Sequence, residues 1–352
     1  MRALVILLLF SALSCRSNIR QKVVPVDPGQ MTSLYAHHEG KERLVILNYG
    51  DAGDPSNGEY QQMTANLMHA ICQAKQCDFA LVNGDNIYER GVSSEDDDAF
   101  LSHFENIYEK FGRFDFWSVL GNHDWRLSAQ GEVNYTLKST RWRMPHAWFE
   151  VPALPDWITI FGLDTTIIHT RIKLDDPKQT NEWEARVAEQ HASAKRALCN
   201  GKGGWKLIFS HHFHYTSSVK RIGDNNRNMH QLIDPLIREC GVQVFSAGHD
   251  HHLELLHVDS NASAFEEHGP YVQIISGAGG RKVRELVPSD DPRVKDRKGV
   301  HQRFARQQYG FNLLIFTPDT LTIEFYTIDQ PDQTPVHTET YHLSDFEKDT
   351  LQ

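Results

Sequence analysis

Five short polar clusters each follow an apolar run, and they hold the residues of this sequence best suited to bind metal ions. They are Gly-Asp-Ala-Gly at 50–53, Gly-Asp-Asn-Ile-Tyr at 84–88, Gly-Asn-His-Asp at 121–124, Ser-His-His-Phe-His at 210–214 and Gly-His-Asp-His at 248–251. A carboxylate such as Asp85 can bridge two cations, which lets them share one phosphate. A phenolate such as that of Tyr88 is a ligand for a strongly Lewis-acidic ion such as Fe(III).

Each cluster also has an ordinary structural explanation. Gly-Asp after a strand is commonly a turn, Asn-His-Asp can cap a helix, and His-x-His can lie on a solvated strand face. In an open α/β sheet, however, ligands bind beyond the carboxyl ends of the strands, and all five clusters are predicted there. Their convergence therefore favours a single site with carboxylate, phenol, amide and imidazole ligands.

Short apolar runs alternate with helical periodicity, which predicts β-α-β units with parallel strands. We expect strands at 44–47, 79–82, 116–120, 158–161, 205–209 and 242–245, and a closing β-rich part with strands at 271–275, 313–316 and 321–326. We expect helices around 63–71, at 100–111 with Gly112 as its end, at 181–198 and at 229–237. Residues 134–149 are predicted as a loop and edge region, and the charged stretch 289–306 as a long surface loop.

Composition limits the class of protein. The chain has 352 residues, of which 40% are hydrophobic and 23% charged, so it can bury a full core. Its net charge of -10 argues against a nucleic-acid partner, because phosphate backbones are bound by a surplus of Lys and Arg.

The first fourteen residues resemble an export signal. Arg2 gives a positive start, residues 3–13 are apolar, and Ala-Leu-Ser at 12–14 is a small-x-small cleavage site, too short a segment for a membrane span. Cys15 follows directly, where a bacterial lipoprotein would carry its lipid. We expect a periplasmic or extracellular protein, with a lipid anchor on Cys15 and plain secretion as the two alternatives.

Four cysteines remain after Cys15, an even number that favours disulfides in an exported chain. Three pairings are possible, and we prefer Cys72 with Cys77 and Cys199 with Cys240. Four unpaired thiols are the alternative. A zinc site is disfavoured, because the C-x4-C spacing has no matching partner pair.

In their order and content the five clusters resemble the motifs of the purple acid phosphatases, within the metallophosphoesterase superfamily. The fourth motif is Ile208 to His211 here, and further segments are similar to the small tartrate-resistant acid phosphatase branch, so the resemblance spans about 44–327. It implies an α/β fold, a four-layer α-β-β-α sandwich of two mixed sheets flanked by helices. We expect a single domain at 43–345, preceded by a linker at 15–42.

The resemblance also implies a ligand set. Asp51, Tyr88 and His251 would hold the first metal, expected to be Fe(III). The second metal, expected to be Fe(II), Zn(II) or Mn(II), would lie in the other half of the site, with Asp85 bridging the two. Its ligands would be Asn122, His211 and His249.

The activity implied is that of an acid phosphatase. It would be monomeric and would hydrolyse phosphate monoesters, in small molecules or phosphoproteins, by attack of a metal-bound hydroxide. His123 would orient the phosphate and protonate the leaving group, unless it only supports the metal ligands. A phosphodiesterase or nucleotide hydrolase of the same superfamily, and a non-catalytic binding or anchoring protein, are the alternatives.

One departure from the family pattern concerns the loop after the fourth motif. The mammalian-type enzymes carry a second active-site histidine there, whereas residues 220–224 read Lys-Arg-Ile-Gly-Asp. Arg221 and His214 are the candidates to compensate. His212, His214 and His252 are otherwise predicted to pack or to lie at the rim.

Overall fold

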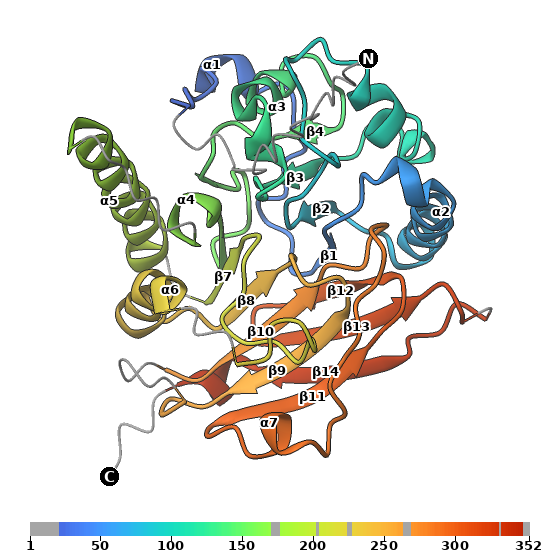
Figure 1. Cartoon of the computed structure of the whole chain (residues 1–352), viewed down its shortest axis with the longest axis vertical. Helices are drawn as coiled ribbons and strands as arrows, with labels where there is room; N and C mark the ends of the chain where they lie inside the picture. The colour runs from blue at the N-terminus through green and yellow to red at the C-terminus, as the bar shows by residue number, and fades with distance from the viewer. Residues whose placement is uncertain are drawn as a thin grey trace, which may run out of the picture.

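The computed structural model describes residues 21–169, 177–201, 204–223, 227–262, 269–330 and 332–347. The predicted export signal and Cys15 lie outside the described residues. Two seven-stranded sheets form the centre of the molecule, with helices on both sides (Figure 1).

The first sheet contains the first four strands of the chain, paired in parallel, and three later strands that extend it beyond β1, each antiparallel to its neighbour. All six residues of β1 and all four of β2 are buried, as their continuous apolar runs predict. In spatial order its strands are β14 (His337–His342), β13 (Thr320–Thr327), β12 (Gly310–Phe316), β1 (Leu44–Tyr49), β2 (Phe79–Val82), β3 (Phe116–Ser118) and β4 (Trp142–Arg143).

The second sheet repeats this plan, with a parallel group, β6, β7, β8 and β10, between antiparallel edges. In spatial order its strands are β11 (Val300–Arg306), β9 (Leu253–Val258), β10 (Tyr271–Ser276), β8 (Val244–Ala247), β7 (Trp205–Phe209), β6 (Ile158–Gly162) and β5 (Phe149–Glu150).

Helices cover the outer faces of both sheets. α2 packs against β1 and β12, whereas α5 packs against β5, β6 and α6 on the other side of the molecule (Figure 1). The helices are α1 (Pro28–Met31), α2 (Gly58–Lys75), α3 (Ala129–Tyr135), α4 (Thr166–His169), α5 (Pro177–Asn200), α6 (Arg227–Cys240) and α7 (Pro292–Lys295). The predicted fold, two mixed sheets flanked by helices, is confirmed.

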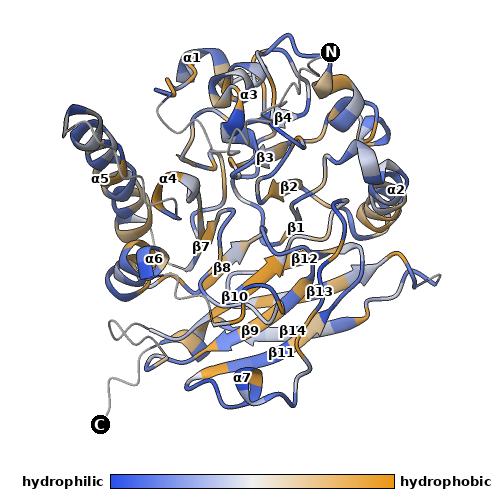
Figure 2. Cartoon of the chain, viewed as in Figure 1, coloured by the Kyte–Doolittle hydropathy of each residue, from blue (hydrophilic) through white to orange (hydrophobic). Residues whose placement is uncertain are grey.

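The sheets enclose one large hydrophobic core, and Figure 2 shows hydrophobic residues along the central strands. A buried polar link crosses this core below the strand ends. Asn83 donates to Asn48 over 3.0 Å, and Ser246 of the second sheet donates to the same Asn48 oxygen over 3.0 Å. Because unpaired amides in a core are costly, this link fixes the two sheets relative to each other at the edge where the polar clusters emerge.

Both preferred disulfides are present. Cys72–Cys77 ties the end of α2 to the segment before β2, and Cys199–Cys240 joins the ends of α5 and α6. Among the described residues, no helix combines the length and the apolar character that crossing a bilayer requires.

Two element predictions are wrong. The stretch 289–306 is not a loop throughout, because β11 pairs antiparallel with β9 and α7 precedes it. β11 is an edge strand, so its charged side chains point to solvent and mask the strand signal. The helix predicted at 100–111 is instead a π-helical turn at Leu101–Glu105 and a 3-10 turn at Glu109–Phe111. Its aromatic stripe is nonetheless in the core, where Phe100 and Phe104 are buried.

The segment 21–42, predicted as a linker, lies against the domain. Val23, Val26 and Met31 are buried in the main core cluster. The Val26 amide donates to the carbonyl of Pro145 over 2.8 Å.

Candidate metal centre

All five polar clusters lie where parallel strands end. Asp51 follows β1, Asp85 follows β2 and Asn122 follows β3 in the first sheet. His211 follows β7 and His249 follows β8 in the second sheet. The predicted site residues therefore come from adjacent strands of two sheets that meet at one edge.

The backbone at this edge is strained. Asp51, Asp85 and His249 have φ of 55°, 50° and 68°, and they make up three of the six non-glycine residues with positive φ in the described part of the chain. Left-handed backbone costs such residues of order 1 kcal/mol each. Glycine is required where these loops touch, since a Cβ on Gly121 would lie 2.2 Å from the Asp85 amide nitrogen. Strain gathered on candidate ligands points to function.

Tyr88 lies between two buried carboxylates. Its hydroxyl oxygen is 2.8 Å from Asp51 Oδ1 and 2.9 Å from Asp85 Oδ2. A phenol has one hydrogen, so it can donate fully to only one of them at a time. A cation among these three oxygens would satisfy all of them, and their hard oxygen donors suit a highly charged ion.

Two imidazoles are oriented by the backbone. Nδ1 of His211 and Nδ1 of His251 lie 2.8 Å and 2.9 Å from backbone carbonyl oxygens. Because a carbonyl only accepts, each Nδ1 carries a hydrogen and donates it. Each Nε2 therefore faces a carboxylate, at 3.4 Å from Asp85 Oδ2 for His211 and 3.4 Å from Asp51 Oδ1 for His251. A Nδ1–H bond to a carbonyl is the usual support of a metal-binding histidine.

The electrostatics are those of a cation site. Burial opposes charge on both Asp85 and His211, yet their mutual attraction lowers the pKa of Asp85 and raises that of His211 to about 9. A proton on His211 thus takes the place of a cation. Burial and the charges of Asp51 and Asp85 raise the pKa of Tyr88 well above its usual value. The phenol keeps its proton unless a strong Lewis acid displaces it.

The second half of the site is formed by His249, His211 and Asp85, whose ligand atoms all lie within 4.8 Å of one another. His249 Nδ1 is 3.0 Å from His211 Nε2, a separation expected of two nitrogens bound at ~2.1 Å to one ion. Burial and nearby imidazoles hold the pKa of His249 well below its usual value, so it stays neutral and able to bind metal. Asn122, in the third cluster, is partly buried, and the amide of the next residue, His123, donates to Asp85 Oδ1 over 2.8 Å.

His123 lies at the edge of the site, with its side chain 15% exposed. Its ring packs edge-on against Tyr88 at 4.5 Å between centroids. Its Nδ1 donates to the Glu89 carbonyl over 2.7 Å, and Arg126 donates to its Nε2 over 3.0 Å. Burial lowers the pKa of His123, and Arg126 lowers it further.

Asp124 is a buried support that sequence reasoning missed. Its carboxylate accepts from the amides of Gly121, Asn86 and Ile87 at 2.7, 3.0 and 3.3 Å. It therefore ties the second and third clusters together. The signal was its place as the last residue of Gly-Asn-His-Asp, a cluster in which we assigned roles to Asn122 and His123 but none to Asp124.

Asp250, between the two histidines of the fifth cluster, plays a similar part. It is fully buried and accepts from Arg284 over 2.8 Å, from Arg221 over 3.2 Å and from Thr216 over 2.7 Å. One of the two candidates to compensate for the missing histidine, Arg221, is thus held at this carboxylate.

The other candidate, His214, the last residue of the fourth cluster, is buried, and its Nδ1 lies 2.8 Å from the Tyr271 hydroxyl. His252 is also buried, 3.0 Å from Glu254. Both histidines pack inside the protein, as expected.

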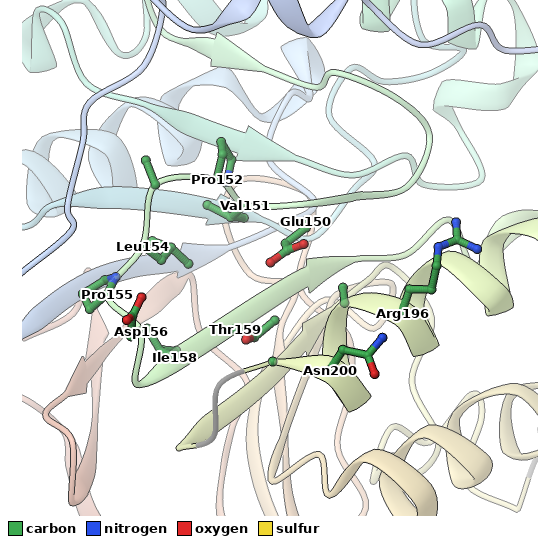
Figure 3. A pocket seen from close by; sticks show the side chains of 13 residues that line it. Glu150, Val151, Pro152, Leu154, Pro155, Asp156, Ile158, Thr159, Arg196 and Asn200 are labelled. Carbon is green, nitrogen blue, oxygen red and sulfur yellow. The ribbon is translucent and has the colours of Figure 1, made fainter.

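A surface pocket lies elsewhere, between the β5–β6 connection and the end of α5 (Figure 3). Glu150, Thr159, Arg196 and Asn200 line it together with the turn at 151–156. None of the predicted ligands contributes to it, so the strand-end site and this pocket are separate.

Comparison with known proteins agrees with the fold and the motifs. The calcineurin-like phosphoesterase family model matches residues 44–253. Purple acid phosphatase 17 of Arabidopsis thaliana is 28% identical over 304 residues, 83% of each chain. Tartrate-resistant acid phosphatase type 5 of Oryctolagus cuniculus is 26% identical over 302 residues, 80% of this chain and 86% of that protein.

Among solved structures, GAP50, the anchor in the inner membrane complex of Plasmodium, superimposes with a TM-score of 0.65 at 16% identity. The match covers 86% of this chain and 89% of that one. At this identity the likeness concerns the fold alone. The family model, in contrast, covers more than half of the 352 residues and contains all five clusters. The chain therefore belongs to the calcineurin-like phosphoesterase family, as a phosphate-ester hydrolase similar to the purple acid phosphatases.

Proposed function

We propose that the protein is an exported acid phosphatase that hydrolyses phosphate monoesters at a dinuclear Fe(III)–M(II) centre. The observation that carries the proposal is the convergence of one phenol, two buried carboxylates and three imidazoles, two of them oriented by backbone carbonyls, at the strand ends. In this set the hydrogen-bond acceptor atoms outnumber the hydrogens that can be donated to them. A pair of bound cations would satisfy the acceptors that are left.

In this proposal Asp51, Tyr88 and His251 hold Fe(III), and Asp85 bridges to the second ion. That ion, Fe(II), Zn(II) or Mn(II), is held by a softer set of ligands, the amide of Asn122 and the imidazoles of His211 and His249. The two ions would supply Lewis acidity to the phosphate and an activated water for attack on phosphorus.

The chain's own residues then position the ester and move a proton. His123 is the candidate proton donor to the leaving oxygen, because it lies at the edge of the site beside Tyr88. In the structure its Nε2 accepts from Arg126, so His123 can act as the acid only after Arg126 turns away and Nε2 takes up a proton from water. That proton then passes to the leaving oxygen, and Arg126 is available to the phosphate anion that remains.

Export is proposed on the apolar start of the chain and the two disulfides, which are typical of oxidising compartments. Two alternatives remain for the exported protein. It is either held at the membrane by a lipid on Cys15 or secreted after cleavage at residue 14. We propose that the enzyme acts as a monomer on small phosphate esters or phosphoproteins.

The experiment that tests the function combines metal analysis, a visible spectrum and a substrate panel. We expect two metal ions per chain, a purple colour from phenolate-to-iron charge transfer, and turnover of monoesters ahead of diesters and diphosphates. Preferred cleavage of diesters or nucleotides would favour the alternative enzyme class. Full metal content without turnover of any ester would favour the binding or anchoring alternative.

A further inference from the structure

His169 is a histidine outside the five clusters that nevertheless faces the candidate metal centre. It is the last residue of α4, in the segment that follows β6, and its side chain is exposed. Its ring stacks on that of His212 at 4.2 Å between centroids and lies 6.0 Å from the ring of His249. An exposed imidazole thus stands beside a proposed ligand of the second metal.

The backbone that carries His169 is held from two sides. Trp183 of α5 donates to the carbonyl of Ile167 over 2.6 Å, and Asn228 of α6 donates to the carbonyl of Ile168 over 3.3 Å. Both isoleucine side chains are buried. A four-residue helix that would fray alone is therefore fixed by its neighbours.

The ring beneath His169 is fixed as well. His212 is buried, and Thr165 accepts from its amide over 2.9 Å and lies 3.0 Å from its Nδ1. His212 is thus a rigid platform between His169 and His249, whose rings lie 4.2 Å and 4.3 Å from it between centroids, and the stacked ring of His169 has little freedom left to lose on binding a ligand.

We infer that His169 positions the substrate by donating a hydrogen bond to a phosphate oxygen at the second metal position. This inference rests on the proposed function. An imidazole carries an N–H in both its neutral and its charged form, so the interaction does not depend on its protonation. In the loop after the fourth motif His214 is buried elsewhere, and Arg221 is held at Asp250. α4 therefore offers the exposed imidazole that this loop lacks.

The test uses His169→Ala and His169→Gln, with His37→Ala as control because His37 is similarly exposed and lies in the N-terminal segment. Inorganic phosphate is titrated into each metal-loaded protein by calorimetry, and metal content is measured. We expect His169→Ala to keep both metals and to bind phosphate about tenfold more weakly, the worth of one exposed hydrogen bond to an anion. His169→Gln, which keeps a donor, should recover part of this loss, and KM should rise more than kcat falls.

Two results would overturn the inference. The first is a phosphate affinity of His169→Ala that equals that of His37→Ala. The second is the loss of one metal ion from His169→Ala, which would make His169 a ligand, as its grouping with His212 and His249 also permits. The proposed function fails separately, if the wild-type protein binds metal and phosphate but hydrolyses no monoester.

Discussion

Replacing Tyr88 by phenylalanine removes one oxygen from between two buried carboxylates. In the metal-free protein the hydroxyl lies within 3 Å of both Asp51 and Asp85, but its single hydrogen makes one full hydrogen bond at a time. The loss is therefore one hydrogen bond to a charged group, about 1.5–3 kcal/mol, and not two. With an unfolding entropy of ~2.1 cal/mol/K per residue, Tm of this 352-residue chain should fall by about 2–4 °C.

Tyr326→Phe is the matched control. Tyr326 is also buried and donates to a carboxylate, that of Glu324, over 2.6 Å, but it lies in β13 away from the strand-end clusters. Both variants should lose similar stability when metal is absent. In the iron-loaded proteins only Tyr88→Phe should lose the visible absorbance per iron, because it alone removes the phenolate.

The assay is thus thermal unfolding with a chelator, together with iron content and a visible spectrum for each variant. An absorbance per iron that survives in Tyr88→Phe refutes Tyr88 as the iron ligand. An active, colourless wild type with Mn or Zn at both positions refutes the iron assignment and leaves the fold intact.

Further changes test other parts of the site and the chain. Asp85→Asn should lose metal and nearly all activity, and two metals per chain in that variant would mean that the bridge is elsewhere. His123→Ala should keep both metals and lose on the order of 10²-fold in kcat on alkyl phosphates but less on p-nitrophenyl phosphate, since a good leaving group needs little help from an acid; equal losses would refute proton donation. If Cys15 is lipidated, Cys15→Ser should move the protein from the membrane to the soluble fraction on cell fractionation, and an unchanged distribution argues for secretion. Removing Cys199–Cys240, whose sequence separation is 41, should lower stability in denaturant by about 4 kcal/mol, against about 2 for Cys72–Cys77 with a separation of 5.

The buried parallel strands could be predicted because their signal is local. Residues 44–47 and 79–82 are unbroken apolar runs, and each is buried as β1 and β2. β11 could not be predicted in this way, because an edge strand with one solvent-facing side has no continuous apolar run. Its pairing with β9 also joins chain segments about fifty residues apart, which no local pattern reveals.

The candidate site likewise has residues that the sequence predicts and residues that it does not. Its motif residues are close in sequence to the strand ends that place them, so their approach to one another followed from the α/β pattern. His169 carries no such mark. It lies seven residues beyond the end of β6, and its position over His212 depends on contacts from α5 and α6. Asp124 was visible in its motif, but its bonds to the second cluster are a property of the fold.

The strained backbone explains why these loops suit metal binding better than ordinary turns would. Gln76 also has positive φ, but there it ends α2, where a left-handed residue caps the helix. Asp51 ends no helix, and its conformation is held by its own backbone, which donates to Gly84 over 3.0 Å and accepts from Arg281 over 2.8 Å. Its carboxylate in turn accepts from the His249 amide over 2.8 Å. The strained residues thus hold one another in place, so the cost of shaping the site is met during folding and the binding energy of the metals need not supply it.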